Sequence, residues 1–545
     1  MTRHLSIKNF YRVLSLVSCV LISVSCLDNG LIRKPPMGWS TWNLFHCNIN
    51  ESLVKEMADA MATKLSKFGY QYVNLDDCWL DPDRDKDGKL QGDKKTFPSG
   101  MKALGDYIHS KGLKFGLYGD PGTRTCAGRP GNQGHEYKDA IAYASWGCDY
   151  LKYDSCAASH SYQLHAYMDM RDALNKTGRP IGYSICPDAS RCNDPNFVMW
   201  DASSVANVVM CRGDQICNKR DINNLGDIQP TWKSWTCILD IQTIFHSMAY
   251  AGPGHFVMPD MLEVGNGMTV AEDRSHFSLW AMIAAPLIAG NDLRNLSDET
   301  LTILTNQEVI DVNQDSQGKP GRRVYYNVND STEVWTRQLD KGDYAVVLFN
   351  RNNTTQNITL LWSYVGLPAD QPAHLRDIWL HKDLGISLSS YTVAVPTHDV
   401  TMLIVSQQPG GQYSCSSVQV SECRNENASQ MWSLNNKDKT IRSLACGVCL
   451  DVYDCQTSKP KNVQMYGCHV GQPGCGSYNQ EWSLNSNGTI TTIIDGKCLT
   501  VVNDQSGAVE TQVCETALLR QMWSTDFEKG LIVSKSASNR CLTVN

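Results

Sequence analysis

The sequence predicts an α/β fold: a (β/α)8 TIM barrel, followed by an antiparallel β-sandwich and by a third unit built from a threefold repeat. Three observations lead to this prediction. Short apolar runs alternate with amphipathic helical stretches over residues 34–313, at intervals of roughly 35 residues, which is typical of repeated βα units. Shorter alternating runs separated by turn residues fill 316–408. Three similar blocks then follow at a period of about 40–50 residues, which indicates stacked like units.

The composition is that of a folded protein with several domains. Of the 545 residues, 42% are hydrophobic and 19% are charged, which allows large cores and argues against disorder or a coiled coil. The net charge is −7 at pH 7, so the chain has no general attraction for a polyphosphate, and we expect no nucleic-acid partner. The 22 cysteines favour an oxidising compartment.

Residues 1–26 have the pattern of a secretory signal peptide, so we expect a secreted, extracellular protein. The segment begins with the basic residues Arg3, Lys8 and Arg12 and continues with an apolar run over 13–24. About 12 apolar residues are too few to span a bilayer, and no later run approaches about 20. We therefore predict no membrane partner.

Nine Asn-x-Ser/Thr sequons accompany this leader and are consistent with a glycoprotein that carries N-glycans. They begin at Asn50, Asn175, Asn295, Asn329, Asn352, Asn353, Asn357, Asn427 and Asn487.

The cysteines outside the leader fall into two groups of ten, separated by a stretch without cysteine over 238–414. One group lies between Cys47 and Cys237, and the other lies between Cys415 and Cys541. An even count on each side predicts two domains that are stapled independently by disulfides and that flank a third domain.

Seven barrel strands can be placed by their apolar runs. The expected strands cover 72–79, 114–120, 150–156, 181–186, 208–210, 256–260 and 286–290. Asn50 is expected to cap the helix that begins near Leu53, because the apolar residues that follow have helical spacing.

Carboxylates recur just after the apolar part of these strands, at Asp76, Asp77, Asp120, Asp154 and Asp260. In a closed parallel barrel these strand ends converge on one mouth, where barrel active sites form. The alternative is that each aspartate caps the next helix, and we expect one or two of them to do so.

The residue types at this mouth suit a polyhydroxylated ligand. Carboxylates accept hydrogen bonds from neighbouring hydroxyls, and aromatic faces stack on sugar rings. Lys152 and the aromatic residues Trp39, Trp42, Trp79 and Tyr118 accompany the carboxylates. Hydrolysis of a glycosidic bond needs two carboxyl groups, and spacing alone does not select the pair. Zinc and dinucleotide motifs are lacking, so we predict neither a metal nor a cofactor.

Several of these segments strongly resemble glycoside hydrolase family 27, the secreted and lysosomal α-galactosidases and their relatives. The resemblance covers residues 33–405 and is carried by 35–42, 75–79, 150–156, 251–254, 259–265, 274–280 and 312–315. It implies a barrel with a following β domain, and a retaining mechanism with a covalent intermediate.

The resemblance also implies roles for individual residues. Asp154 would be the nucleophile, kept ionised beside Lys152. Asp227, which opens an Asp-Ile-x-x-x-Trp motif, would first protonate the leaving oxygen and then activate water. Further implied pocket residues are Asp76 and Asp77, which would grip the 4- and 6-hydroxyls of galactose, and Trp39, Tyr118, Lys152 and Asp260. The implied disulfides are Cys47–Cys78 and Cys126–Cys156.

Two segments depart from the family pattern. The family has a Trp-Arg pair four residues before the acid, where this chain has Ile222-Asn223, so Arg212 and Arg220 are the candidates for the 2-hydroxyl contact. After the fifth strand the family has Cys-Glu-Trp or Cys-Ser-Trp, whereas this chain has Cys186 followed by Pro-Asp. The subsite for the sugar 2-position is therefore rebuilt, and the preference there stays open.

The threefold repeat resembles the ricin-B type β-trefoil, carbohydrate-binding module family 13. Gln-x-Trp segments at 430–432, 480–482 and 521–523 accompany Cys-Leu-x-Val segments at 449–452, 498–501 and 541–544. Since the pattern opens in mid-unit, we expect the terminal strand to close onto the opening half-unit. By the resemblance, a lobe binds sugar when Asp follows Cys-Leu and Asn precedes the glutamine, which Asp451 and Asn479 fulfil. A purely structural trefoil is the alternative.

We therefore predict a signal peptide (1–26), a catalytic barrel (27–315), a sandwich (316–408) and a trefoil (409–545). The predicted function is a secreted retaining exo-glycosidase that removes terminal α-linked D-galactose from galactosides and galactomannan-type oligo- and polysaccharides. The enzymatic alternatives are an α-N-acetylgalactosaminidase and a β-L-arabinopyranosidase of the same family. A secreted galactose-binding lectin is the non-enzymatic alternative, and the sequence leaves an oligomer open.

Overall fold

The computed structural model describes 29–187, 203–211, 227–244, 251–367, 372–387, 390–407, 415–424, 428–435, 439–443, 445, 448–459, 462–468, 478–503, 505–526, 530–536 and 540–544. Several of the sequence predictions lie outside these described residues. They are the leader 1–26, Arg212, Arg220 and Asn427.

The barrel is one curled sheet of eight parallel strands in the order β7-β6-β5-β4-β3-β2-β1-β8. The strands are β1 Met37–Ser40, β2 Tyr72–Asn74, β3 Lys114–Gly119, β4 Tyr150–Tyr153, β5 Gly182–Ile185, β6 Val208–Met210, β7 Phe256–Met258 and β8 Leu287–Ala289. All seven strands placed from the sequence are present. Several are shorter than their apolar runs, because the last residues leave the ladder and enter loops.

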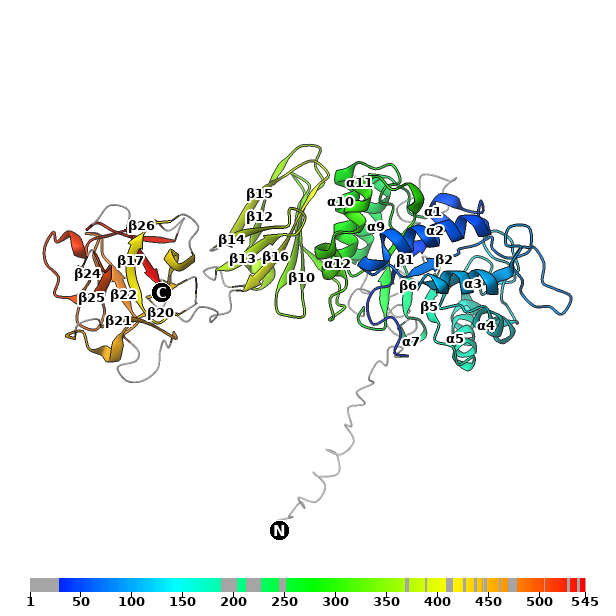
Figure 1. Cartoon of the computed structure of the whole chain (residues 1–545), viewed down its shortest axis with the longest axis horizontal. Helices are drawn as coiled ribbons and strands as arrows, with labels where there is room; N and C mark the ends of the chain where they lie inside the picture. Colours follow the sequence, from blue (N-terminus) through cyan, green and yellow to red (C-terminus); the bar gives the residue numbers. More distant parts are fainter. Residues whose placement is uncertain are drawn as a thin grey trace, which may run out of the picture. The chain divides into compact units, whose positions relative to one another are not determined.

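Helices follow the strands, as the βα pattern predicts. They are α1 Trp42–Phe45, α2 Glu51–Lys64, α3 Gly100–Ser110, α4 Glu136–Ser145, α5 His160–Lys176, α7 Ser203–Val205 and α9 Trp232–Ile244. Helices α2 to α5 lie outside the barrel strands (Figure 1). Asn50 caps α2 as predicted, since its Oδ1 accepts a hydrogen bond from the Leu53 amide at 2.9 Å.

Gly38 allows β1 and β2 to approach each other closely. A Cβ atom on residue 38 would lie 2.2 Å from the carbonyl oxygen of Tyr72 and 2.7 Å from its Cβ. No rotamer change relieves a contact with backbone, so a larger residue would push the two strands apart. Because β1 leads directly into Thr41 and Trp42, this glycine also sets where the first loop of the mouth begins.

The segment after the barrel forms two antiparallel sheets, as predicted. One sheet has the order β14-β13-β16-β11-β10-β9, and β12 pairs with β15. The strands are β9 Arg322–Asn327, β10 Thr332–Gln338, β11 Tyr344–Asn350, β12 Gln356–Leu361, β13 Ala373–Asp377, β14 Lys382–Ser387, β15 Ser390–Val395 and β16 Val400–Gln407. The preceding helices are α10 Val270–Met282, α11 Asp298–Leu304 and α12 Gln307–Asn313, of which α10 packs on β10, β11 and β16.

The C-terminal unit has threefold repetition in its core. Each Gln-x-Trp indole N–H donates to the carbonyl of a Cys-Leu leucine. The pairs are Trp432 to Leu542 at 2.8 Å, Trp482 to Leu450 at 2.9 Å and Trp523 to Leu499 at 3.0 Å. The same bond in three places explains why these tryptophans recur: they join successive lobes around one apolar core.

The ends of the trefoil meet as the sequence predicts. Strand β17 (Val418–Glu422) pairs with the last strand, β28 (Arg540–Val544), and Cys423 bonds to Cys541. The other strands are β18 Trp432–Asn435, β19 Thr440–Ser443, β20 Cys449–Val452, β21 Val463–Tyr466, β22 Trp482–Leu484, β23 Ile490–Thr492, β24 Cys498–Asn503, β25 Ala508–Gln512, β26 Trp523–Asp526 and β27 Leu531–Ser534.

Disulfides cross-link the barrel domain and the trefoil, each within itself. Both bonds that the family resemblance implies, Cys47–Cys78 and Cys126–Cys156, are present, and the trefoil adds Cys449–Cys468 and Cys498–Cys514. The even number of cysteines in the barrel domain does not mean that every one of them forms a disulfide. Cys148 is a buried thiol that donates to the Tyr150 carbonyl at 3.1 Å, and burial raises its pKa to about 12.

Across the part of the chain that the structure describes, none of the helices has the length and apolar character needed to cross a bilayer.

Replacing Gly38 by alanine should lower the free energy of unfolding by about 1–3 kcal/mol, because the new methyl group overlaps the Tyr72 backbone. Gly252→Ala is the matched control, since a Cβ there meets no atom within 4 Å; we expect a change within about 0.5 kcal/mol. Denaturant unfolding of both variants measures the difference. Equal losses would contradict the close approach of β1 and β2.

Candidate active site

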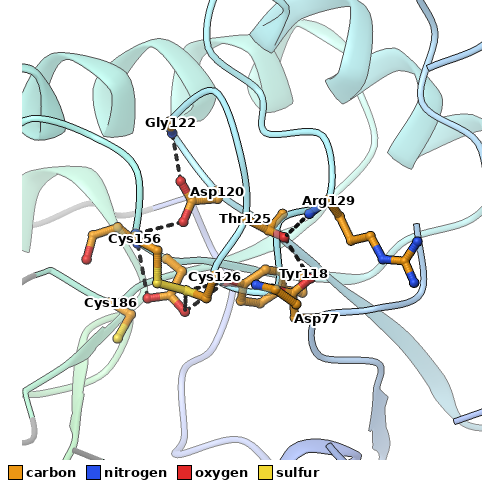
Figure 2. Close-up of a disulfide and its surroundings, with 12 residues drawn as sticks. Asp77, Tyr118, Asp120, Gly122, Thr125, Cys126, Arg129, Cys156 and Cys186 are labelled. Atoms are coloured by element: carbon orange, nitrogen blue, oxygen red, sulfur yellow. Dashed lines mark hydrogen bonds between the residues drawn. A yellow bond between two sulfur atoms is a disulfide. The ribbon is translucent and has the colours of Figure 1, made fainter. Parts of the chain in front are cut away.

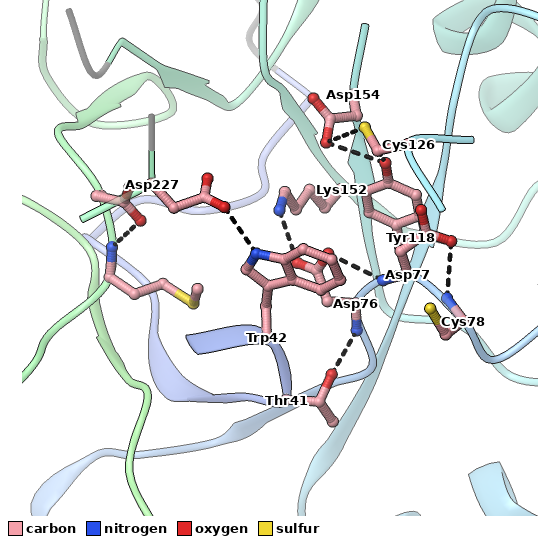
Figure 3. A network of polar contacts seen from close by, with 12 residues as sticks. Thr41, Trp42, Asp76, Asp77, Cys78, Tyr118, Cys126, Lys152, Asp154 and Asp227 are labelled. Carbon is pink, nitrogen blue, oxygen red and sulfur yellow. Dashed lines mark hydrogen bonds and ion pairs between the residues drawn. The ribbon is translucent and has the colours of Figure 1, made fainter. Parts of the chain in front are cut away.

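Carboxylates gather where the barrel strands end. Asp76 and Asp77 follow β2, Asp120 follows β3 and Asp154 follows β4, and all four are less than a tenth exposed. Parallel strands end on the same side of their sheet, so these side chains lie at one mouth. Figure 3 shows Asp76, Asp77 and Asp154 there. Buried charge is costly unless it is paired or hydrogen-bonded, so the partners of each carboxylate indicate its role.

Asp76 forms an ion pair with Lys152 from β4. The Nζ–Oδ2 distance is 2.6 Å, and the two side chains are 4% and 18% exposed. Thr41 fixes the backbone of Asp76, because its hydroxyl accepts the Asp76 amide at 3.0 Å. A cation paired with a carboxylate offers both donors and acceptors, a combination that suits the hydroxyls of a sugar.

Asp154 is held by neutral donors. Tyr118 donates its hydroxyl to Oδ2 at 3.0 Å, and the Ser155 amide donates to Oδ1 at 3.0 Å. Burial, followed by the charge of Asp154, raises the pKa of Tyr118 well above its ordinary value, so this hydroxyl stays a donor. A carboxylate held in this way is fixed in orientation and keeps the remaining lone pairs for a reacting atom.

Asp77 holds the loop between β3 and α4. It accepts hydrogen bonds from the Cys78 amide at 2.7 Å, the Thr125 hydroxyl at 2.9 Å and the Ala127 amide at 2.8 Å. Burial raises its pKa above the ordinary value, and the two amides oppose that rise. Most of its acceptor capacity is thus used within the chain.

Asp120 ties the same loop to the segment after the nucleophile candidate. Its carboxylate accepts the Gly122 amide at 2.7 Å and the Cys156 amide at 2.8 Å, beside the Cys126–Cys156 disulfide (Figure 2). Burial raises its pKa to about 7, and the nearby charge of Asp154 adds to the rise. The sequence placed Asp120 at the mouth without a role, and these bonds make it an anchor.

Asp227 and Asp260 come from the far side of the barrel. Trp42 donates its indole N–H to Oδ2 of Asp227 at 2.8 Å. Asp260 is 1% exposed and accepts the amides of Ile228 at 3.0 Å and Met261 at 2.7 Å. Asp260 therefore fixes the backbone directly after Asp227.

The two tryptophans of the first segment take different places. Trp39 is fully buried and donates its indole N–H to the carbonyl of Asn291 at 2.7 Å, so it does not join the polar cluster. Trp42 is the indole that reaches Asp227. The sequence names Trp42 only as an aromatic wall, and nothing in its local pattern separates it from Trp39. Cys186 is buried at the end of β5, where its carbonyl accepts the Tyr167 hydroxyl at 3.3 Å.

A cavity in the barrel lies around the Lys152–Asp76 pair. Its polar lining includes Ser40, Asn74 and Ser184, and its apolar lining includes the methionines Met210, Met258 and Met261. Among the described residues, the ligand atoms of Asp120, Cys126 and Cys156 are close enough to hold a metal ion. Both sulfurs belong to a disulfide, so neither offers a thiolate, and we assign no metal to this group.

The trefoil lobe that contains Asp451 differs from the other two. Asp451 Oδ2 accepts Asn479 Nδ2 at 2.8 Å and Gln480 Nε2 at 2.9 Å, and Oδ1 accepts Gln464 Nε2 at 3.1 Å. In the other lobes the Gln-x-Trp glutamine bonds to a threonine hydroxyl at 3.1 Å instead. The same lobe exposes three tyrosines, each more than half: Tyr453, Tyr466 and Tyr478.

Comparisons with known proteins agree with this architecture. Residues 34–315 match a family model described as alpha galactosidase A, and 329–405 match an alpha galactosidase C-terminal beta sandwich domain. Residues 399–523 and 447–545 match a ricin-type beta-trefoil lectin domain.

Individual relatives extend the likeness over the barrel and sandwich. The chain is 44% identical over 419 residues to alpha-galactosidase A of Cellvibrio japonicus, covering 72% of this chain and 98% of that one. It is 45% identical to alpha-galactosidase 3 of Arabidopsis thaliana, covering 70% and 84%. The crystal structure of alpha-galactosidase I from Mortierella vinacea matches with a TM-score of 0.63 and 34% identity, over 70% of this chain and 99% of that one. This chain therefore belongs to the glycoside hydrolase family 27 α-galactosidases, with a ricin-type β-trefoil at its C-terminus.

Proposed function

We propose that the protein is a secreted retaining exo-α-galactosidase that removes terminal α-linked D-galactose from galactosides and galactomannan-type chains. The observation that carries this proposal is the pair Asp154 and Asp227, two carboxyl groups that are each held by a neutral aromatic donor. Retaining glycosidases need two carboxyl groups with separate roles, and we assign these roles to this pair. The identity to α-galactosidases over the whole barrel supports the same reaction.

The proposed reaction has two steps. Asp154 attacks C1 of galactose while the C1–O bond breaks and Asp227 gives its proton to the leaving oxygen. Asp227, now a carboxylate, then takes a proton from water, whose oxygen attacks C1 and releases Asp154. Asp76, with its partner Lys152, is proposed to hold hydroxyls of the sugar ring, and Asp77 to join it from its anchored position.

The sugar 2-position decides between the enzymatic alternatives. Cys186 stands where the family resemblance places a 2-position contact, and the arginine candidates Arg212 and Arg220 lie outside the described residues. An α-N-acetylgalactosaminidase therefore remains the second candidate. Asp77 argues against a β-L-arabinopyranosidase, because those enzymes resemble this pattern with a bulkier carboxylate that blocks the 6-hydroxymethyl group.

Secretion and glycosylation belong to the same proposal. The leader pattern and the disulfide-stapled domains support an oxidising, extracellular location. Seven sequon asparagines in the described residues are exposed, and an exposed Asn-x-Ser/Thr is what a glycan requires. Asn352 is the exception: it is half-buried, and its Nδ2 donates to the Asp330 carbonyl at 3.1 Å. Of the overlapping pair we therefore propose Asn353 as the glycan carrier.

The trefoil is proposed to retain the enzyme on its galactoside polymer through the Asp451 lobe. Three donors orient the Asp451 carboxylate, and the exposed tyrosines of that lobe offer faces for sugar rings. The neighbouring lobes have a threonine in place of Asp451. We therefore assign the binding of the galactoside polymer to the Asp451 lobe and not to the other two lobes.

Wild-type enzyme should hydrolyse p-nitrophenyl α-galactoside in preference to its 2-acetamido analogue and to the β-L-arabinoside. Asp154→Ala should reduce kcat by at least about 10³-fold, because no covalent intermediate forms. Added azide should restore turnover of the variant and give the β-galactosyl azide, by attack from the face that Asp154 occupies. Activity of wild type on none of the three substrates would overturn the proposed function.

Asp120→Asn should flatten the pH dependence of stability. A carboxyl group whose pKa is about 7 in the fold, against an ordinary 3.8, binds its proton more tightly when folded. Its contribution is fully present below about pH 4 and is lost as the pH rises to about 7. Denaturant unfolding across that window should show a smaller decline for the variant than for wild type. If the free energy of unfolding of the variant fell with pH as steeply as that of wild type, the raised pKa of Asp120 would be contradicted.

Asp451→Asn should shorten retention on a galactomannan column, because it removes the charged acceptor of the one complete lobe. Thr500→Ala is the matched control, since Thr500 takes the place of Asp451 in the next lobe. We expect its retention to equal that of wild type. Equal retention of all three proteins would refute the binding role, and equal hydrolysis of a small galactoside by all three would show that the barrel is intact.

A further inference from the structure

Tyr167 lies behind the proposed nucleophile. It belongs to α5 and is fully buried. Its hydroxyl donates towards two backbone carbonyls, that of Asp154 at 3.2 Å and that of Cys186 at 3.3 Å. These residues follow β4 and β5, which are neighbours in the barrel sheet. A phenol from a helix outside the barrel thus ties together the ends of two adjacent strands.

The hydroxyl of Tyr167 keeps its proton and its position. Burial raises the pKa of Tyr167 well above its ordinary value, so the group remains a donor. The ring of Tyr153 packs edge-on against the ring of Tyr167, with centroids 6.1 Å apart. Tyr183 donates its hydroxyl to the carbonyl of Tyr167 at 3.2 Å. Rings and backbone around Tyr167 therefore fix the place from which it donates.

The Asp154 carbonyl and the Ser155 amide are the two ends of one peptide unit. A peptide unit is planar, so a contact that fixes the direction of its C=O also fixes the direction of its N–H. The Ser155 N–H donates to Oδ1 of Asp154 at 3.0 Å. Tyr167 thus holds one end of the peptide unit, and the carboxylate of the nucleophile receives the other end.

We propose that Tyr167 is a positioning residue for the nucleophile, because through this peptide unit it directs and strengthens the Ser155 N–H that donates to Asp154. The inference rests on the proposed function, which gives Asp154 the role of nucleophile. A hydrogen bond to the carbonyl polarises the peptide unit and makes its N–H a stronger donor. Tyr118 donates to the other carboxylate oxygen, Oδ2, from β3 (Figure 3).

The hydrogen bond from Ser155 changes strength as the charge of Asp154 changes. In the first step Asp154 bonds to C1, the C1–O electron pair leaves with the oxygen that Asp227 protonates, and Asp154 becomes a neutral ester. In the second step a water oxygen bonds to C1, its proton goes to Asp227, and Asp154 leaves with the electron pair as a carboxylate. An N–H bond to an ionised acceptor is about twice as strong as one to a neutral acceptor. Tyr167 therefore favours the second step.

Steady-state kinetics of the full-length protein test this proposal. Tyr167→Phe keeps the ring and removes the hydroxyl. The substrate is 2,4-dinitrophenyl α-galactoside, whose good leaving group makes the first step fast, so that the second step sets kcat. We expect kcat to fall by about 3- to 10-fold, because the donor to the leaving carboxylate is weakened.

KM should fall by the same factor as kcat. The ratio kcat/KM reports only the steps up to the departure of the leaving group, so it should change by less than about twofold. KM does not depend on how much of the sample is folded. A variant that is partly unfolded therefore still gives this readout, whereas a merely structural role would lower kcat and leave KM unchanged.

Tyr183 provides the matched control. It is buried beside Tyr167, and its hydroxyl donates to the carbonyl of Tyr167 and not to that of Asp154. Tyr183→Phe also removes one buried phenol hydroxyl. It should lower the midpoint of denaturant unfolding and leave KM at the wild-type value.

The outcomes separate the role of Tyr167 from the proposed function. Wild-type enzyme that hydrolyses no α-galactoside overturns the proposed function. With active wild type, a KM of Tyr167→Phe that stays the same or rises overturns the role of Tyr167 and leaves the proposed function standing. An equal fall of KM in Tyr183→Phe has the same consequence. A parallel fall of kcat and KM that is confined to Tyr167→Phe supports the role of Tyr167.

Discussion

Buried carboxylates at one barrel mouth are the constraint on which the surrounding structure depends. A buried carboxylate is stable only when donors satisfy it, and several lie at neighbouring strand ends. Lys152 pairs with Asp76 from β4, two strands away in the sheet, and backbone amides of the mouth loops donate to Asp77 and Asp120. The loop conformations and the Cys126–Cys156 disulfide serve this requirement, because they bring the amides to the charges.

The aspartates of the mouth differ in their hydrogen-bond donors: some accept mainly backbone amides, and others accept an aromatic side chain. Asp77 and Asp120 accept hydrogen bonds from backbone amides and so hold loops in place. Asp154 and Asp227 each receive one aromatic donor, a tyrosine hydroxyl or an indole N–H. The aromatic donors orient these two carboxyl groups, whereas the amides that donate to Asp77 and Asp120 belong to the loops that those carboxylates hold. Trp335 donates to Glu333 in the same way, so the aromatic donors accompany the family resemblance and do not identify the proposed catalytic pair by themselves.

In the trefoil, the repeated residues belong to the core and not to a polar site. The three indole hydrogen bonds to leucine carbonyls are nearly equal in length, so the tryptophan of each lobe packs in an equivalent way. The lobes differ in sequence: Asp451 stands where the other lobes have threonine, and the exposed tyrosines among the described residues of the trefoil belong to the Asp451 lobe. This difference between the lobes is the basis of the proposed sugar site, because the shared packing of the tryptophans does not require it.

The sequence by itself determined what depends on local or periodic chemistry. Strand positions, the Asn50 cap and the closure of the trefoil ends all follow from apolar spacing, a capping side chain or a repeat that opens in mid-unit. Only the tertiary structure decided which side chains meet. Trp39 and Trp42 are alike in sequence, yet one fills the core and the other reaches Asp227, because contacts with residues far along the chain set their directions. Likewise, the cysteine count could not reveal that Cys148 stays a thiol. Pairing and orientation are long-range geometric facts, and no local pattern encodes them.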